Sequence, residues 1–246
     1  MCIRDRCVSI RRFRRAGLRL DELARPAELE LLSWAVHARA NVLVTGAAGA
    51  GKTTLLNALA CAIPSNERVV TIEDAAELAL DAAHVVRLEA RPPNSEGVGA
   101  VTVRDLVRNA LRMRPDRIVV GEVRGPEVID MLQAMETGHD GSFSTCHANG
   151  PLAALHRLES LVLATDMSMP VPVIRRHLAS CIDFVVHLER TANGKRTIRE
   201  ICEVASFAPN TCELDVQVVV AVGEAVDSPR RQPRRSGTTP FAWSAP

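Results

Sequence analysis

The sequence has few aromatic residues and almost no net charge. Aromatic residues make up 3% of the 246 residues, tyrosine is absent, and the formal net charge is +1. Proteins that bind nucleic acid generally show a basic domain, and grooves that bind single strands carry aromatic side chains for base stacking. Neither feature is evident here, so the composition argues against a nucleic-acid-binding protein.

Cysteine pairs and long apolar runs are also missing. The seven cysteines form no C-x-x-C pair and show no His/Cys spacing suited to zinc. Scattered cysteines in a chain without an export signal indicate a reducing compartment. No apolar run approaches the roughly 20 residues that a membrane helix needs. The arginine-rich N-terminus lacks the apolar region of a secretory signal. We therefore expect a cytoplasmic protein without an integral membrane segment.

Two kinds of apolar pattern alternate along the chain. Short apolar runs typical of buried strands, such as 41–46 and 117–120, alternate with helical patterns such as 103–111. This alternation predicts an α/β fold with a mainly parallel central sheet flanked by helices. An Asn-Gly turn at 193–194 predicts a C-terminal β-hairpin at the edge of the sheet.

Helix ends are indicated at three positions. Pro26 is expected at the start of a helix, where its missing N–H costs nothing. Thr102 is a candidate N-cap for the helix over 103–111. Gly138 is a candidate C-cap for the helix that begins near Pro126.

Residues 46–53, GAAGAGKT, match the phosphate-binding loop pattern G-x-x-x-x-G-K-[ST]. Glycines let successive N–H groups turn toward phosphate oxygens, and the following helix adds the positive end of its dipole. Lys52 would bridge the β- and γ-phosphates, and the Thr53 hydroxyl would bind Mg²⁺. The alternative is a loop that keeps this shape without its ligand. We expect ATP and Mg²⁺ to bind, with the nucleotide held by Gly46, Ala47, Ala48, Gly49, Ala50, Gly51, Lys52, Thr53 and Thr54.

Acidic residues follow two of the expected strands. Glu73, Asp74 and Glu77 follow one strand, and Glu122 follows another. Hydrolysis needs a carboxylate to orient or deprotonate water, and open α/β sheets bind ligands at the carboxyl ends of their strands. A lone acid there is generally a cap or a surface charge, but two such clusters after a phosphate loop favour catalysis. His147 also follows a strand, and both a structural role and a γ-phosphate-sensing role remain open for it.

Several motifs occur in the order found in the secretion ATPase superfamily, whose members power type II and type IV secretion and type IV pili. They are GAAGAGKT (46–53), TIEDAAEL (71–78), RMRPDRIVVGEVRG (112–125), TGHDGS (137–142) and STCHAN (144–149). Three stretches resemble the CpaF ATPases of tight-adherence (Tad/Flp) pilus assembly in particular. These are VSIRRF (8–13), VVRLEARPPN (85–94) and LVRNALRMRPDRIVVGEVRG (106–125). The resemblance covers residues 8–205.

The resemblance implies a RecA-like ATPase domain and roles for its acids. Glu122 resembles the Walker B residue, which acts on Mg²⁺ through water. TIEDAAEL resembles the aspartate box, whose acids orient the attacking water, with Glu77 as first candidate and Glu73 and Asp74 in support. His147 matches the histidine box. The lack of C-x-x-C pairs counts against the type II branch, many of whose members carry a zinc-binding insertion.

The resemblance also implies partners and a domain organisation. Family members form homohexamers that contact an inner-membrane pilus or secretion platform protein from the cytoplasmic side. They carry an N-terminal domain that supplies part of the nucleotide site, and this chain resembles the motor domain alone. We expect an N-terminal arm at 1–20, of which 1–7 is suspected to be artefactual, a motor domain at 21–207, a strand extension at 208–225 and a disordered tail at 226–246.

Two questions stay open at this point. Arg104, Arg108 and Arg112 lie at i+4 spacing on the polar face of one helix, and Arg114 and Arg124 follow it. These arginines either are solvated or contact a neighbouring subunit's nucleotide. The favoured function is ATP hydrolysis that powers Tad/Flp pilus assembly or protein secretion across the inner membrane. The alternatives are a conjugative type IV secretion ATPase and a truncated nucleotide-binding module without turnover of its own.

Overall fold

The computed structural model describes residues 18–80, 82–165, 168–208, 210–230, 234 and 238–243. Most of the expected arm at 1–20 therefore lies outside the described residues, including the stretches at 1–7 and 8–13. The described elements are, in chain order, α1 (Leu20–Leu23), α2 (Pro26–His37), β1 (Val42–Gly46), α3 (Lys52–Cys61), β2 (Val69–Glu73), β3 (Val85–Glu89), α4 (Val103–Ala110), β4 (Arg117–Val120), α5 (Glu127–Glu136), β5 (Phe143–Cys146), α6 (Pro151–Leu163), α7 (Val171–Cys181), β6 (Phe184–Arg190), β7 (Arg196–Ala208), β8 (Glu213–Ala221) and β9 (Glu224–Ala225).

Local sequence signals explain where the helices begin and end. Pro26 is the first residue of α2, as predicted. Thr102 caps α4, because its hydroxyl accepts the Asp105 N–H at 3.1 Å while the Asp105 carboxylate accepts the Thr102 N–H at 3.0 Å. The C-cap of α5 is Thr137, one residue before the expected Gly138. Gly138 follows it with a φ of 96°, a left-handed conformation that favours glycine.

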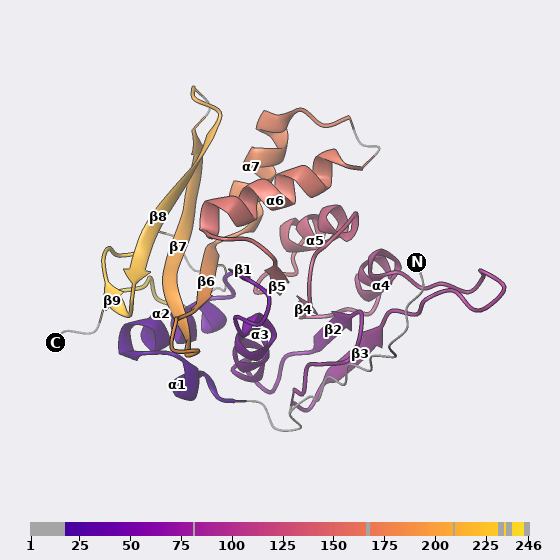
Figure 1. Cartoon of the computed structure of the whole chain (residues 1–246), viewed down its shortest axis with the longest axis horizontal. Helices are drawn as coiled ribbons and strands as arrows, with labels where there is room; N and C mark the ends of the chain where they lie inside the picture. Colours follow the sequence, from indigo (N-terminus) through magenta and orange to yellow (C-terminus); the bar gives the residue numbers. More distant parts are fainter. Residues whose placement is uncertain are drawn as a thin grey trace, which may run out of the picture.

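The described strands form one sheet of nine, in the order β3-β2-β4-β5-β1-β6-β7-β8-β9 (Figure 1). The first six strands in this order run parallel to one another, and β7, β8 and β9 continue the sheet in antiparallel pairs. The predicted α/β fold with a mainly parallel sheet is therefore confirmed. The expected hairpin is β6 and β7, and β8 and β9 lie outside it toward the edge.

Helices cover both faces of the parallel part of the sheet (Figure 1). The helices α1 to α3 pack on one face, and α4 to α7 pack on the other. Side chains of β1 alternate between the two layers, since Val42 and Val44 contact the first and Leu43 contacts the second. Every residue of β1 is buried, as expected for a parallel strand covered on both faces. No helix in the described part of the chain is long and apolar enough to cross a bilayer.

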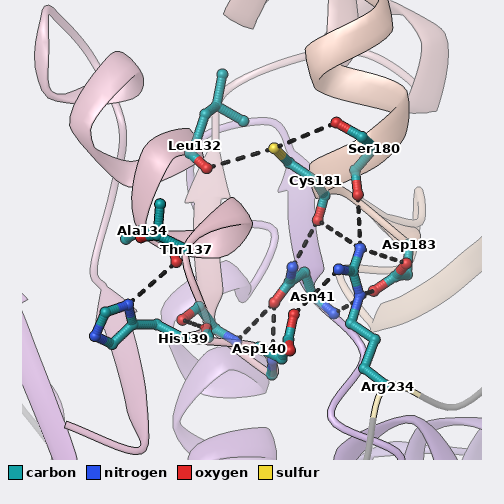
Figure 2. Close-up of polar contacts among 12 residues, drawn as sticks. Asn41, Leu132, Ala134, Thr137, His139, Asp140, Ser180, Cys181, Asp183 and Arg234 are labelled. Carbon is teal, nitrogen blue, oxygen red and sulfur yellow. Dashed lines mark hydrogen bonds and ion pairs between the residues drawn. The ribbon is translucent and has the colours of Figure 1, made fainter.

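Described residues near the C-terminus pack against the body of the protein. Trp34 of α2 lies edge-on to Phe241, with ring centroids 5.4 Å apart. Arg234 donates to the Asp183 carboxylate, with Nε at 2.8 Å (Figure 2). The predicted disordered tail at 226–246 stays a prediction, and these contacts concern only its described residues.

Asn41 links the amino-terminal ends of three neighbouring parallel strands (Figure 2). It is fully buried and directly precedes β1. Its Oδ1 accepts the N–H groups of Gly141 and Ser142, before β5, at 2.8 and 3.0 Å. Its Nδ2 donates to the Cys181 carbonyl at 2.7 Å, and its backbone N–H donates to the Asp183 carboxylate at 2.7 Å, before β6. These bonds align β5, β1 and β6 at the amino ends of the strands.

We predict that Asn41→Ala lowers the free energy of unfolding by about 3 kcal/mol, because the buried N–H groups of Gly141 and Ser142 lose their acceptor. Urea unfolding followed by circular dichroism measures this difference. The control is Asn109→Ala on the exposed surface of α4, which should change the value by no more than about 0.5 kcal/mol. Equal losses in the two variants would contradict the role assigned to Asn41.

Candidate active site at the carboxyl ends of the strands

Two glycines shape the loop between β1 and α3. Gly46 ends β1 with a φ of 152°, and a Cβ there would lie 2.5 Å from the Leu188 carbonyl oxygen of β6. Gly51 directly precedes α3 with a φ of 100°. Both glycines of the sequence pattern are therefore required, Gly46 by close packing and Gly51 by a left-handed backbone. The loop brings the amino end of α3 to the carboxyl end of β1.

Lys52 folds back onto this loop. Its Nζ donates to the carbonyl oxygens of Gly46 and Ala47 at 2.9 and 3.0 Å, and only 7% of the residue is exposed. Burial lowers the pKa of Lys52, and the negative charge of Glu122 opposes this shift. The loop therefore holds a cation that is shielded from water, an arrangement that favours an anionic ligand.

Glu73, the last residue of β2, organises the turn that follows it. Its Oε1 accepts the N–H groups of Glu77 and Leu78, both at 3.0 Å. Burial raises the pKa of Glu73 above its ordinary value, although the two hydrogen bonds oppose the shift. Glu73 therefore holds the turn in place, whereas Glu77 is only half-buried.

Glu122 follows β4 and is bound by two basic side chains. One carboxylate oxygen is hydrogen-bonded to Nδ1 of His147, and the other accepts from Arg124, whose Nε lies at 2.7 Å. Arg124 also pairs with Asp74 at 3.1 Å. Burial acts to raise the pKa of Glu122, but the hydrogen bonds from Arg124 and His147 outweigh it, and the pKa lies below its ordinary value. Charged and hydrogen-bonded contacts thus link the ends of β2, β4 and β5.

These groups line one cavity of about 820 Å³. All the candidate catalytic residues contribute to its wall, namely Glu73, Asp74, Glu77, Glu122 and His147. The candidate nucleotide-binding residues in the wall are Ala48, Gly49, Gly51, Lys52, Thr53 and Thr54. Gly46, Ala47 and Ala50 are not part of the wall, and Gly46 and Ala47 instead provide the carbonyl oxygens that hold Lys52. The fold therefore brings the loop and both acidic clusters to one place.

Three polar residues of the wall were not predicted from the sequence: Asn57, Thr145 and Arg196. Asn57 of α3 accepts the Ala79 N–H at 2.8 Å. Thr145 of β5 donates to the Gly121 carbonyl at 2.7 Å and so fixes the turn before Glu122. Position near a strand end is a signal that could have indicated Thr145. No local pattern indicates Arg196, which comes from β7.

Of the three arginines at i+4 spacing, Arg104 and Arg108 lie on α4 and face α5, whereas Arg112 lies beyond the end of α4. Arg104 and Arg108 each donate through Nε to the carboxylate of Asp130 at 2.7 Å, and Asp130 is buried. These two arginines therefore neutralise a buried carboxylate, a role that neither of the two alternatives foresaw. Arg112 is exposed. Arg104 and Arg108 therefore give no support to the alternative in which they contact a neighbouring subunit's nucleotide.

The residues present fit a nucleoside triphosphate and a magnesium ion. The cavity volume lies within the range of small-molecule sites. Gly49 has a φ of 74°, and a Cβ there would meet no atom within 4 Å, so this part of the loop is open. Thr53 and Glu122 offer the oxygen ligands that Mg²⁺ prefers. Among the described residues no group of three or more His, Cys, Asp or Glu is arranged to hold a metal.

Proteins of known structure share this fold. The VirB11 ATPase from the Brucella suis type IV secretion system, solved in complex with sulphate, aligns with a TM-score of 0.64 and 36% identity. That alignment covers 74% of this chain and 52% of VirB11. The pilus retraction motor PilT, solved with bound ADP, aligns with a TM-score of 0.62 and 26% identity, over 78% of this chain and 54% of PilT.

We predict that Glu73→Gln changes how stability depends on pH. Because burial raises the pKa of Glu73 in the folded state above its ordinary value of 4.5, wild type should lose stability as the pH rises from 4.5 toward that raised pKa. The glutamine variant has no such loss and keeps an oxygen that can accept the same N–H groups. Urea unfolding between about pH 4 and pH 7 measures the difference.

The control for this experiment is Glu96→Gln, in an exposed loop, which should follow the pH dependence of wild type. The account of Glu73 is contradicted if wild type instead gains stability relative to Glu73→Gln as the pH rises.

Sequence comparison identifies the family. The family model for "Type II/IV secretion system protein" matches residues 2–225. One curated relative is "Putative conjugal transfer protein Rv3659c" of Mycobacterium tuberculosis, with 47% identity over 200 residues. The match covers 79% of this chain and 56% of the relative, so the chain spans about half the length of the proteins it matches. The phosphate loop, the strand-end acids and this match together show that the chain belongs to the type II/IV secretion system protein family.

Proposed function

We propose that this chain hydrolyses ATP with Mg²⁺ and that the hydrolysis drives a type II/IV secretion or pilus machine. One observation carries the proposal: a single cavity is lined by the phosphate loop, by both strand-end acidic clusters and by His147. A loop that had lost its ligand would have no need to keep both acidic clusters beside it. Membership of the secretion ATPase family supports the same activity.

The phosphate loop and the start of α3 would bind the triphosphate. The backbone N–H groups at the start of α3 and the positive end of its dipole would meet the phosphate oxygens. Lys52, already held beside the loop by the Gly46 and Ala47 carbonyls, would bridge the β- and γ-phosphates. A magnesium ion held through Thr53 and, by way of water, Glu122 would neutralise charge on the phosphates.

The residues of the two acidic clusters would carry out hydrolysis. Glu77 lines the cavity, and the turn that carries it is held by Glu73 through two hydrogen bonds. We assign Glu77 as the group that orients the attacking water and accepts its proton as oxygen bonds to the terminal phosphorus and ADP leaves. His147 and Arg124 hold the Glu122 carboxylate in one orientation. Asp74 supports this arrangement through its ion pair with Arg124.

Two machines remain candidates for the work that hydrolysis drives. The stretches at 85–94 and 106–125 resemble the CpaF ATPases of Tad/Flp pilus assembly. The conjugal transfer name of the Mycobacterium tuberculosis relative and the type IV secretion system of VirB11 favour a conjugative or type IV secretion ATPase. In either case we propose a homohexamer on the cytoplasmic side, bound to an inner-membrane platform protein. A strain that carries Lys52→Ala in the native gene distinguishes the two machines. Loss of piliation would indicate pilus assembly, and loss of plasmid transfer would indicate a conjugative ATPase.

We predict that Lys52→Ala and Glu77→Gln each reduce ATP turnover at least about 100-fold, since one removes the phosphate contact and the other the proton acceptor. Lys52→Ala should also weaken nucleotide binding, whereas Glu77→Gln should leave binding nearly unchanged. Phosphate release and calorimetric titration of ATP measure the two effects. Turnover of wild type should rise steeply with protein concentration if subunits assemble.

Glu96→Gln, exposed and distant in sequence from both acidic clusters, is the matched control and should turn over ATP as wild type does. If wild type binds ATP through Lys52 but shows only background turnover at every concentration, the hydrolysis claim fails for this chain. The nucleotide-binding module would then be the better description.

A further inference from the structure

Arg196, in the C-terminal hairpin, lies across the phosphate loop although it is far from that loop in the sequence. Its Nε–H donates to the Gly49 carbonyl at 2.9 Å. Its Cδ lies 3.2 Å from where a Cβ on Gly51 would stand, so the side chain passes directly over Gly51. Arg196 also lines the same cavity as Lys52. No candidate role from the sequence included it.

The sheet explains why an arginine at this position reaches the loop. The first strand of the hairpin, β6, pairs with every residue of β1, and Leu188 stands opposite Gly46. The returning strand, β7, begins with Arg196 just beyond that point. Ile198, two residues later on the same face, packs into the core with α3. The side chain of Arg196 therefore points to the face of the sheet on which the loop and α3 lie.

The charges at the tip of the hairpin favour an anion. Arg196 stands opposite Arg190 in the β6–β7 pairing, and Lys195 is its neighbour in the chain. Like charges directly opposite each other across a strand pair are destabilising. The nearby Glu189 is already paired with Arg199 at 3.2 Å. The negative charge of a polyphosphate in the adjoining cavity would offset the repulsion between these basic side chains.

The guanidinium of Arg196 has donors to offer such a ligand. Guanidinium carries five N–H donors, and the contact with Gly49 uses the one on Nε. For the terminal nitrogens, no hydrogen bond or ion pair to another described residue is found. Arg196 can therefore hold the loop carbonyl with Nε and present the end of its fork to phosphate oxygens, the geometry in which arginine binds phosphate best.

We propose that Arg196 is a nucleotide-binding residue that the C-terminal hairpin contributes to the phosphate loop, holding Gly49 and contacting the phosphates of a nucleoside triphosphate. The inference rests on the proposed ATPase function and adds a residue to its binding site. It also gives the hairpin a physical means of responding to the ligand, because the same side chain contacts both the loop and the phosphates.

The test is calorimetric titration of a non-hydrolysable ATP analogue with Mg²⁺ into wild type, Arg196→Ala, Arg196→Gln and Arg199→Ala. Arg199 is the matched control, because it lies on the same strand, is exposed and pairs with Glu189 rather than lining the cavity. Arg196→Ala and Arg196→Gln should each raise Kd about tenfold. Arg199→Ala should stay within about twofold of wild type.

Salt separates a phosphate contact from a purely structural role. If Arg196 contacts the phosphates, the affinity gap between wild type and Arg196→Gln should shrink as salt rises from about 0.05 to about 0.5 M, because added ions screen exposed charges. The proposal is overturned if both Arg196 variants bind like Arg199→Ala, or if the gap is unchanged by salt.

Binding by Lys52→Ala shows whether a negative result refutes only the role of Arg196 or also the proposed function. If wild type binds and Lys52→Ala does not, but both Arg196 variants bind like wild type, only the role of Arg196 is refuted. If wild type itself does not bind the analogue, the proposed function and this inference are refuted together.

Discussion

Asn41 makes the contacts on which the position of the site depends. Hydrogen bonds from its buried side chain and its backbone N–H link the amino ends of β5, β1 and β6 to one another. Because parallel strands advance by the same amount per residue, a register set at one end is carried to the other. There Gly46 comes so close to Leu188 that no side chain fits between them. The phosphate loop therefore starts from a fixed point beside the ends of its neighbours.

The charges gathered at that edge compensate one another within the site. Burial works against the charged forms of Lys52, Glu73 and Glu122 alike. Glu122 stays ionised because Arg124 and His147 bind it, and Lys52 is supported by loop carbonyls and by the charge of Glu122. Contacts of this kind hold the side chains in place before a ligand arrives, which is the condition for electrostatic catalysis.

Much of the fold could be predicted from local patterns in the sequence. The apolar run before Gly46, the Pro26 start of α2 and the Thr102 cap of α4 depend on neighbouring residues, and the structure confirms each of them. The convergence of Glu73 and Glu122 followed from the rule that parallel strands end together. These features need no knowledge of contacts between distant parts of the chain.

Contacts between distant residues could not be predicted in this way. Arg104 and Arg108 turn toward Asp130 on another helix, and a helical pattern shows which face they share but not what covers it. The reach of Arg196 to Gly49 spans 147 positions. The contact between Arg234 and the buried carboxylate of Asp183 joins residues 51 positions apart, and no local pattern indicated it. In each case the deciding partner lies far away in the sequence.

The central claim is that one cavity binds Mg²⁺ and ATP between the phosphate loop and the strand-end acids. A crystal structure with Mg²⁺ and a non-hydrolysable ATP analogue tests it most directly. The account predicts the terminal phosphate within hydrogen-bonding distance of Lys52, the ion beside Thr53 on the side of Glu122, and Glu77 facing the terminal phosphate. A nucleotide bound with its phosphates away from Lys52, or with Glu77 and Glu122 turned from the terminal phosphate, would contradict it.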